Sequence, residues 1–368
     1  MKTLLPVAIL LACSTLSGCV LLRDSGPTLR ILDQGAFGQF DSIKGPFENQ
    51  TGVKLVRLEG GDAGTALKTA LLGAGNPPAD ILFGVDNVLF STPEIREKSL
   101  FVPYESPNLY RIDEDLISVD IFRVNGELWA TPVEHGYISV NYDIRLRNST
   151  PTQELPTTLR DLATARWAPR FVTEDPSKSS PGLGFFLATI ATFPDGSAYD
   201  WKHYWRDLLQ NGTKVVHDWT TAYVYHYSGG YGSYDSNNAA DRNITVSYTT
   251  SPAYEVIFGT PSVPGVSFEP AKGVFHQVET MGILRGTKNL EHAKKFIDYM
   301  LTDDFQQYNA PSNAVYPVTR GTELPALLTE LSTDPRDLRP AQISKGQLDA
   351  KLETWINDWV ALYQAETA

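Results

Sequence analysis

Four aromatic residues stand beside polar turns that follow strand-like segments, where their rings could hold a flat cation. Trp219 and Tyr223 follow one short apolar segment, and Tyr248 and Tyr254 bracket a polar turn farther along the chain. An aromatic face attracts a cation electrostatically, and each such contact contributes on the order of 0.5–2 kcal/mol. The four rings would thus form a stacking pocket. The alternative is that two or three of them, Tyr223 and Tyr248 above all, are core residues.

A second polar segment offers hydroxyl groups at the start of a helix. Residues 174–184 follow a predicted strand, and an apolar helix over 185–192 comes next. Pro181 suits the first helical position and Ser180 suits the cap, with Ser179 beside it. Free helix amides and two hydroxyls would favour an oxyanion or another acceptor at this point. The alternative is an ordinary helix cap without a ligand.

Two further loops carry carboxylates and glycines. Asp86 and Asn87 follow a buried strand, where Asp86 could accept a hydrogen bond from an amino group or face a cation. The alternative is an N-cap, and both roles can hold together. Gly60, Gly61 and Asp62 lie in a loop that leads into a helix.

These turns are positioned by alternating strand and helix signals, which predict an α/β fold with mainly parallel sheets. Strands are expected over 29–32, 53–58 and 80–85, with helices between them. The crossovers of such βαβ units are right-handed, so the loops after the strands share one edge of the sheet. In open α/β sheets that edge is where ligands bind.

Composition excludes several classes of function. The chain has 368 residues and a formal net charge of −12, so it can form two domains and has no positive surplus for nucleic acid. Its two cysteines, Cys13 and Cys19, lie within the first twenty residues. The rest of the chain therefore has no disulfide, thiolate metal ligand or cysteine nucleophile.

The N-terminus is typical of an export signal. Lys2 precedes an apolar run over 4–11 that is too short to span a bilayer. The run leads to Leu16-Ser17-Gly18-Cys19, which resembles a bacterial lipobox. We expect a signal peptide over 1–18, a lipid on Cys19 and a tether over 19–27. The alternative is an ordinary signal peptide with an incidental cysteine.

Several stretches between about Leu29 and Trp359 resemble the thiamine-binding proteins of bacterial ABC importers, a branch of the periplasmic solute-binding proteins. The stretches that carry the resemblance are Ser247-Tyr-Thr-Thr-Ser-Pro-Ala-Tyr254, Asp175-Pro176 with Ser180-Pro-Gly-Leu-Gly184, Val85-Asp86-Asn87, Gly136-Tyr137 with Asn141-Tyr142-Asp143, and Tyr316-Pro317-Val318. The resemblance implies two α/β lobes joined by crossing strands, as in type II binding proteins, with the ligand clamped in a central cleft.

The same resemblance implies roles for individual residues. Trp219 and Tyr254 match aromatic residues around the thiamine rings, and Ser179 and Ser180 match hydroxyl positions near the polar tail. The loop over 59–65 and Asp86 match loops of the first lobe that face the ligand.

The chain departs from the family pattern at two places. Gln34 stands where the family usually has a tyrosine over the pyrimidine, with Phe37 nearby, and Ala314 replaces a tryptophan. Losing two rings changes affinity by about 100-fold or more unless other aromatics compensate. The ligand is therefore predicted to be thiamine or a thiamine-related compound, including its phosphates or pyrimidine moiety.

The chain path predicts a discontinuous first lobe, built from 27–136 and 280–368, and a second lobe over 137–279. Crossing strands over 134–137 and 277–280 would act as hinges. Glu134 and Glu279 lie there as partners for a cation or, alternatively, as solvent-facing carboxylates.

Two other segments are ambiguous. Residues 228–241 look like an insertion, either a flap near the ligand or a surface excursion. Leu348, Leu352, Trp355, Ile356 and Trp359 have helical spacing and predict a packing helix.

The predicted function is binding without catalysis, as a lipid-anchored monomer in the cell envelope that serves an ABC permease. Thiaminases share the scaffold but use a cysteine nucleophile, and no Gly-x-Ser-x-Gly or metal-binding histidine spacing occurs here. No catalytic residue, metal site, cofactor or nucleic acid is expected. The competing ligands are ferric iron and a polyamine; iron would require adjacent tyrosines, and Tyr248 and Tyr254 are separated in sequence.

Overall fold

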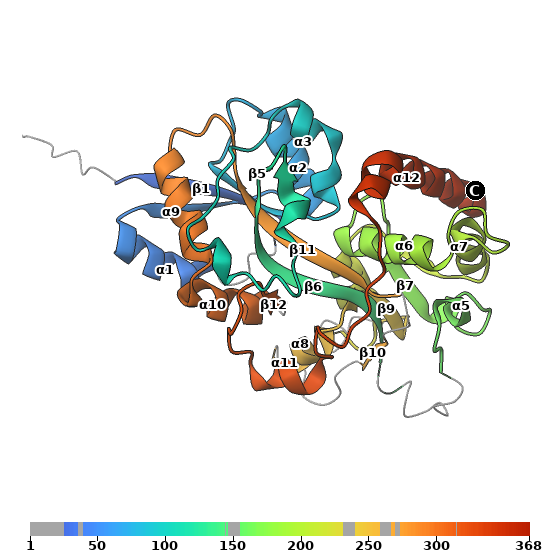
Figure 1. Cartoon of the computed structure of the whole chain (residues 1–368). Coiled ribbons are helices and arrows are strands. Elements are labelled where there is room, and N and C mark those ends of the chain that lie inside the picture. Colours follow the sequence, from blue (N-terminus) through green and yellow to red (C-terminus); the bar gives the residue numbers. More distant parts are fainter. Residues whose placement is uncertain are drawn as a thin grey trace, which may run out of the picture.

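The computed structural model describes residues 26–35, 40–143, 145, 155–230, 240–257, 266–268, 273–313 and 315–368. Within them the chain forms two α/β lobes joined by two long strands (Figure 1). The predicted signal peptide, Cys19, Phe37 and Ala314 lie outside the described residues, as does most of the predicted insertion over 228–241.

The first lobe is built on a parallel sheet, as the sequence predicts, and its strands lie in the order β2-β1-β3. Its strands are β1 (Thr28–Asp33), β2 (Lys54–Glu59) and β3 (Ile81–Asp86), with a hairpin of β4 (Arg123–Val124) and β5 (Glu127–Leu128). Its helices are α1 (Phe40–Thr51), α2 (Ala63–Leu72), α3 (Pro93–Glu97), α9 (Leu290–Met300) and α10 (Asp303–Asn313), with short turns η1 (Leu89–Ser91), η2 (Leu109–Arg111) and η3 (Val119–Phe122).

The second lobe has its own parallel strands in the order β9-β7-β8. These are β7 (Phe171–Glu174), β8 (Lys214–Val216) and β9 (Ile244–Tyr248). The helical segments are α5 (Leu159–Leu162), η5 (Ala168–Arg170), α6 (Ser180–Thr192), α7 (Trp201–Gln210), η6 (Thr221–His226) and α8 (Ser251–Ile257).

The two lobes are joined by β6 (Thr131–Tyr142) and β11 (Phe275–Ile283), which run between them in Figure 1. They pair with each other antiparallel, and β11 also pairs with β3 while β6 pairs with β9. Both contain the segments that the sequence predicts to cross. The shorter β10 (Val266–Phe268) and β12 (Tyr316–Pro317) pair with β6, and α11 (Ala326–Leu331) follows β12.

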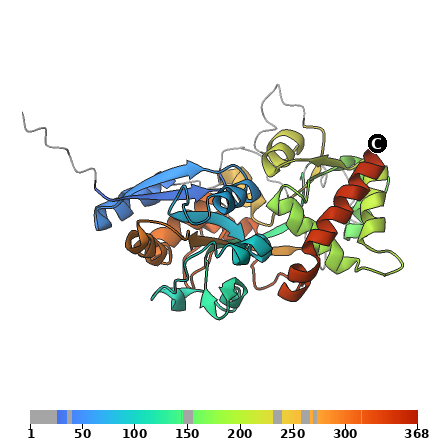
Figure 2. The same cartoon turned by 90° about the horizontal axis from the view of Figure 1, so that it is seen from above.

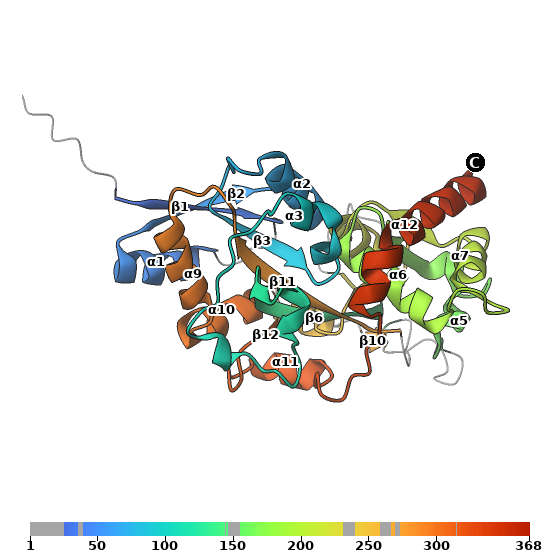
Figure 3. The same ribbon diagram turned by 45° about the horizontal axis from the view of Figure 1, so that its top comes forward.

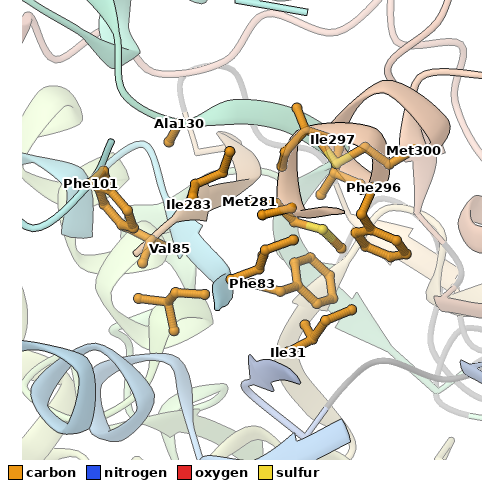
Figure 4. Close-up of a cluster of buried hydrophobic side chains, with 14 of the residues drawn as sticks. Ile31, Phe83, Val85, Phe101, Ala130, Met281, Ile283, Phe296, Ile297 and Met300 are labelled. Atoms are coloured by element: carbon orange, nitrogen blue, oxygen red, sulfur yellow. The ribbon is translucent and has the colours of Figure 1, made fainter. Parts of the chain in front are cut away.

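Each lobe has a separate hydrophobic core. In the first, Phe83 and Met281 of the sheet face Phe296 and Ile297 of α9 (Figure 4). In the second, Trp205 lies among aromatic side chains of α6 and α7. Two cores joined by strands are what a hinge motion between rigid lobes requires.

The C-terminal helix α12 (Lys345–Thr367) lies against the second lobe, as Figures 2 and 3 show from two directions. The sequence boundaries place residues 280–368 in the first lobe, so α12 departs from them. The cause is its apolar stripe: Trp355 and Trp359 are buried in the second core, and Lys202 of α7 pairs with Asp358 at 2.6 Å. The packing helix predicted for this tail is confirmed.

Helix α6 begins one residue earlier than predicted. Ser179, not Ser180, is the N-cap, and its Oγ accepts a hydrogen bond of 3.4 Å from the amide of Gly182. Ser179 has the extended backbone of a cap residue, while Ser180 is already helical. Pro181 therefore lies within the first turn rather than at its first position.

Replacing Gly182 by alanine is expected to destabilise the protein by about 1–3 kcal/mol, because this helix start touches strand β7. A Cβ at residue 182 would lie 2.8 Å from the carbonyl oxygen and 2.9 Å from the Cβ of Glu174. Urea unfolding should show this loss. Gly346→Ala is the matched control, because nothing lies within 4 Å of a Cβ there. Equal stability of the two variants would contradict the close approach.

Candidate functional site

The crossing strands carry a group of polar side chains where the two lobes meet. Glu134 of β6 lies opposite Glu279 of β11, and Glu279 is also paired with Asp86 at the end of β3. Side chains two residues apart on a strand share a face, so Gln277 lies beside Glu279. Tyr248, at the end of β9, adds a phenol from the second lobe. Both lobes therefore contribute to one polar group.

Gln277, which the sequence analysis missed, links these residues. Its Oε1 accepts a hydrogen bond of 2.8 Å from the hydroxyl of Tyr248. Its Nε2 donates to Asp86 at 3.2 Å and to Glu279 at 3.3 Å. Counting back two residues from Glu279 along the predicted crossing strand is the signal that could have identified it.

Asp86 caps the turn that follows β3, as one of the two sequence interpretations predicts. Its Oδ1 accepts hydrogen bonds from the amides of Val88 at 2.9 Å and Leu89 at 2.8 Å. Ser180 of α6 also donates to this carboxylate, which makes a contact between the lobes. Burial raises the pKa of Asp86, and these hydrogen bonds partly offset the rise.

The neighbouring Asn87 holds β3 to β11. Its Nδ2 donates to the carbonyl of His276 at 3.1 Å, and its Oδ1 accepts from the amide of Val278 at 2.9 Å. Because both polar ends of the amide are bound to backbone, this side chain fixes the hinge strand rather than offering a vacant hydrogen-bonding end.

Glu134 and Glu279 are buried, with 2% and 9% of their surfaces exposed, so the solvent-facing alternative is wrong. Asn309 and Asn313 donate to Oε2 of Glu134, the latter at 2.9 Å. Gln34 donates to Oε2 of Glu279 at 2.5 Å, which brings this predicted residue into the group. Burial raises the pKa of both carboxyl groups, and for Glu279 the charge of Glu134 raises it further.

The aromatic residues divide into different environments. The ring of Trp219 stacks on Tyr223 with centroids 4.8 Å apart and an interplanar angle of 11°. Tyr223 is 1% exposed and its hydroxyl donates to Glu255, as expected of a core residue. Trp219 is half-buried, and its Nε1 donates to Ser247 at 2.9 Å. The backbone of Tyr254 belongs to α8, but its side chain lies outside the described part of the chain.

The predicted glycine loop shapes the start of α2. Asp62 is its N-cap and accepts a hydrogen bond of 2.8 Å from the amide of Thr65. The amide of Gly60 donates to the carbonyl of Asp33, next to Gln34, and a Cβ there would lie 2.9 Å from that oxygen. Gly61 has a φ of +84°, a conformation that favours glycine.

Glu174 is a second residue that the sequence analysis missed. It ends β7 and is fully buried, yet within the described residues its carboxylate has no partner beyond its own backbone amide. Burial and then the charge of Asp218 raise the pKa of Glu174 to about 8. Its position after a predicted strand, at the edge where α/β proteins bind ligands, was the available signal.

Two histidines lie on the other face of the crossing strands. His135 Nδ1 is 3.0 Å from His276 Nε2, and the ring of Tyr137 stacks on His276 at 4.4 Å. Burial lowers the pKa of both imidazoles, that of His276 to about 4. In the described ranges, no three histidine, cysteine or carboxylate side chains are grouped to hold a metal ion.

A family model described as bacterial extracellular solute-binding protein matches residues 76–336. The chain belongs to this family. The thiamine-binding periplasmic protein of Escherichia coli K12 is 26% identical over 313 residues, which cover 83% of each chain. Iron uptake protein A2 of Synechocystis sp. PCC 6803 is 26% identical over 266 residues, which cover 71% of each.

The fold of this solute-binding protein is shared with a solved periplasmic thiamin binding protein. The two superpose with a TM-score of 0.69 at 23% identity, covering 92% of this chain and 96% of the other. The predicted two-lobe α/β fold is therefore confirmed. The matched relatives are named as binding and uptake proteins, and those that bind thiamine are named as periplasmic.

The described part of this solute-binding protein has no helix with the length and apolar character that crossing a bilayer requires.

Proposed function

We propose that this solute-binding protein captures thiamine or a thiamine-related compound between its lobes and delivers it to an ABC permease. The observation that carries the proposal is the group of buried carboxyls near Tyr248: Gln277 hydrogen-bonds to its hydroxyl, to Asp86 and to Glu279, and Glu134 lies opposite Glu279. Burial, and then the charges of Glu279, Asp86, Glu174 and Glu134, raise the pKa of the Tyr248 hydroxyl well above the usual value. A site of this charge favours a cation such as the thiazolium of thiamine.

The rings of thiamine would give the aromatic residues a stacking partner. Trp219 hydrogen-bonds to Ser247, the residue before Tyr248, so its indole lies at the same end of β9 as Tyr248. Stacking of a thiazolium or aminopyrimidine on an aromatic face contributes about 0.5–2 kcal/mol. The N-terminus of α6, with Ser179 and Ser180, suits the polar tail or a phosphate. The thiamine-binding relatives support the same ligand.

A polyamine would satisfy the carboxylates but would leave the stacking role of Trp219 unused. Ferric iron is the ligand suggested by the name of one relative. In the part of the chain that the structure describes, no three histidine, cysteine or carboxylate side chains are grouped closely enough to hold a metal ion. Iron would also require adjacent tyrosines, and Tyr248 and Tyr254 are separated in sequence. Thiamine therefore accounts for more of the site.

Ligand capture would act through the two lobes. A molecule that touches Asp86 in the first lobe and Ser180 or Trp219 in the second stabilises the closed arrangement by its contacts to both. Docking of that closed shape on the permease then requires no chemical step.

Calorimetric titration of the purified protein with thiamine, its phosphates, its pyrimidine and thiazole halves, spermidine and ferric citrate tests the assignment. We expect heat and a rise in Tm with at least one thiamine-related compound. Binding of spermidine or iron alone would reject thiamine and leave the fold assignment intact.

Trp219→Ala and Tyr254→Ala are each expected to weaken thiamine binding tenfold or more, because each removes a stacking face. The dissociation constant measured by calorimetry gives the effect. Tyr110→Ala is the matched control, since Tyr110 is 79% exposed on the first lobe. Unchanged affinity in both test variants would reject the aromatic site.

The proposal also includes an envelope location with a lipid on Cys19. Mass spectrometry of the protein purified from membranes should find a diacylglycerol adduct on an N-terminal Cys19. A Cys19→Ala variant should leave the membrane fraction, because it has no thiol to carry the anchoring lipid. Membrane retention of that variant would contradict the lipid anchor.

A further inference from the structure

Glu134 and Glu279 form a buried carboxyl pair that a single proton would stabilise. They lie opposite each other on hydrogen-bonded strands, so their side chains share one face of the sheet, and both are buried. Two ionised carboxylates repel each other in such surroundings, which favours protonation of one of them. The pair therefore carries one proton and one negative charge.

Among the residues that the structure describes, the side chains bonded to the pair are hydrogen-bond donors and none is basic. The amides of Asn309 and Asn313 donate to Glu134, and those of Gln34 and Gln277 donate to Glu279. These four groups are neutral. Within the described residues, the ion pairs include none made by these two glutamates. Neutral donors stabilise one negative charge but leave the second without compensation.

The titratable groups that face the pair make a second negative charge still less favourable. Asp86 lies at the end of β3 beside Glu279, and its charge raises the pKa of that carboxyl. Tyr248 approaches from β9, and its hydroxyl is already bound to Gln277. The histidines of the same strands, His135 and His276, lie on the opposite face.

Glu174 provides an independent sign that a positive group belongs here. It is 0% exposed and comes from the second lobe, and both oxygens lack a partner among the described side chains. Its charge acts on the hydroxyl of Tyr248, as do those of the pair and of Asp86. The charge of Asp218 also raises the pKa of Glu174. Burying a carboxylate without a partner is costly unless a ligand supplies that partner.

We propose that an organic cation enters this site in exchange for the proton held between Glu134 and Glu279. The inference rests on the proposed function, because it requires a cationic ligand. The cation supplies the missing positive charge, both carboxylates ionise, and the proton passes to solvent. The exchange is balanced: the protonated protein and the cation give the complex and one hydrogen ion. When the ligand leaves, the pair takes a proton back.

The exchange predicts how affinity depends on pH. Linkage requires that a ligand whose binding releases a proton binds more tightly as pH rises. Glu174, whose pKa is raised to about 8, would add part of a second proton at pH 7. The whole protein should thus release at least one proton when the ligand binds, and a variant that lacks the pair's proton should release about one fewer.

Calorimetric titration with thiamine at pH 7 in phosphate, HEPES and Tris counts the protons, because the observed heat changes with the ionisation enthalpy of the buffer. We expect at least one proton released by the wild type and about one fewer by Glu279→Gln. In that variant the new amide donates to Glu134, which is then ionised before the ligand arrives. Glu330→Gln, a change at an exposed position, should keep the wild-type count.

Each outcome separates the two proposals. Thiamine binding with no buffer dependence, or with the same count in Glu279→Gln, overturns the exchange and leaves the proposed function standing. No binding by any thiamine-related compound overturns the proposed function, and the exchange fails with it. Infrared spectra of the free protein at pH 7 give a second check: the wild type should show a protonated carboxyl band that Glu279→Gln reduces. An unchanged band would overturn the shared proton.

Discussion

Glu174→Gln is expected to make the ligand-free protein more stable at pH 8 by several kcal/mol. Glutamine has the same shape but no charge, and Glu174 is fully buried with its pKa raised to about 8 from 4.5. This difference in pKa corresponds to at most about 5 kcal/mol of unfolding free energy. Urea unfolding of both proteins between pH 4.5 and 8.5 measures the change.

The sign of this effect follows from proton binding. Between pH 4.5 and 8 the folded wild type holds the proton of Glu174 while the unfolded chain releases it. Stability from this group is thus fully present below pH 4.5 and is lost as pH rises toward 8. The advantage of Glu174→Gln should therefore be near zero at pH 4.5, grow with pH and level off above 8.

Glu330→Gln is the control for this series, since Glu330 is exposed on α11. Surface substitutions of this kind change stability by about 0.5 kcal/mol or less. An advantage of Glu174→Gln that does not vary with pH would show that the carboxyl is not held protonated by burial.

A residue that destabilises the free protein by its charge needs another reason to be present. The same Glu174→Gln change should weaken thiamine binding tenfold or more, because it removes one of the four carboxylates around Tyr248. Opposite effects on stability and on affinity are typical of binding residues. They would also distinguish Glu174 from a core residue, whose loss lowers stability.

The sequence predicted best those parts of the site that local patterns determine. The strand ends at Asp86 and Tyr248 follow from runs of buried residues that end in polar turns, and α8 follows from Ser251-Pro252. The error at the start of α6 is a single residue, because two consecutive serines can both serve as the cap.

The remaining features depend on pairing between distant segments. Whether Glu134 faces solvent or Glu279 is decided by the register of β6 against β11, which lie far apart in sequence. Gln277 and Glu174 are ordinary polar residues in isolation, and only burial beside Tyr248 gives them a role. Local periodicity carries no such information.

Trp359→Ala is expected to destabilise the second lobe by about 3–5 kcal/mol, the usual cost of removing a buried tryptophan. Trp359 is 1% exposed, and its ring meets Trp205 of α7 edge to face with centroids 5.6 Å apart. The residues that bind α12 to this lobe lie more than a hundred positions earlier in the chain. Urea unfolding followed by tryptophan fluorescence measures the loss.

The location of the loss tests where the C-terminal helix belongs. If α12 is part of the second lobe, hydrogen exchange in Trp359→Ala should quicken in α6 and α7 and remain slow in β1 and β3. Glu353→Ala, at an exposed position of the same helix, should leave both lobes protected. Faster exchange confined to β1 and β3 would return residues 345–367 to the first lobe, as the chain path alone suggests. Because ligand capture needs each lobe to move as a rigid unit, the helix that completes the second core also sets which residues move together with Trp219.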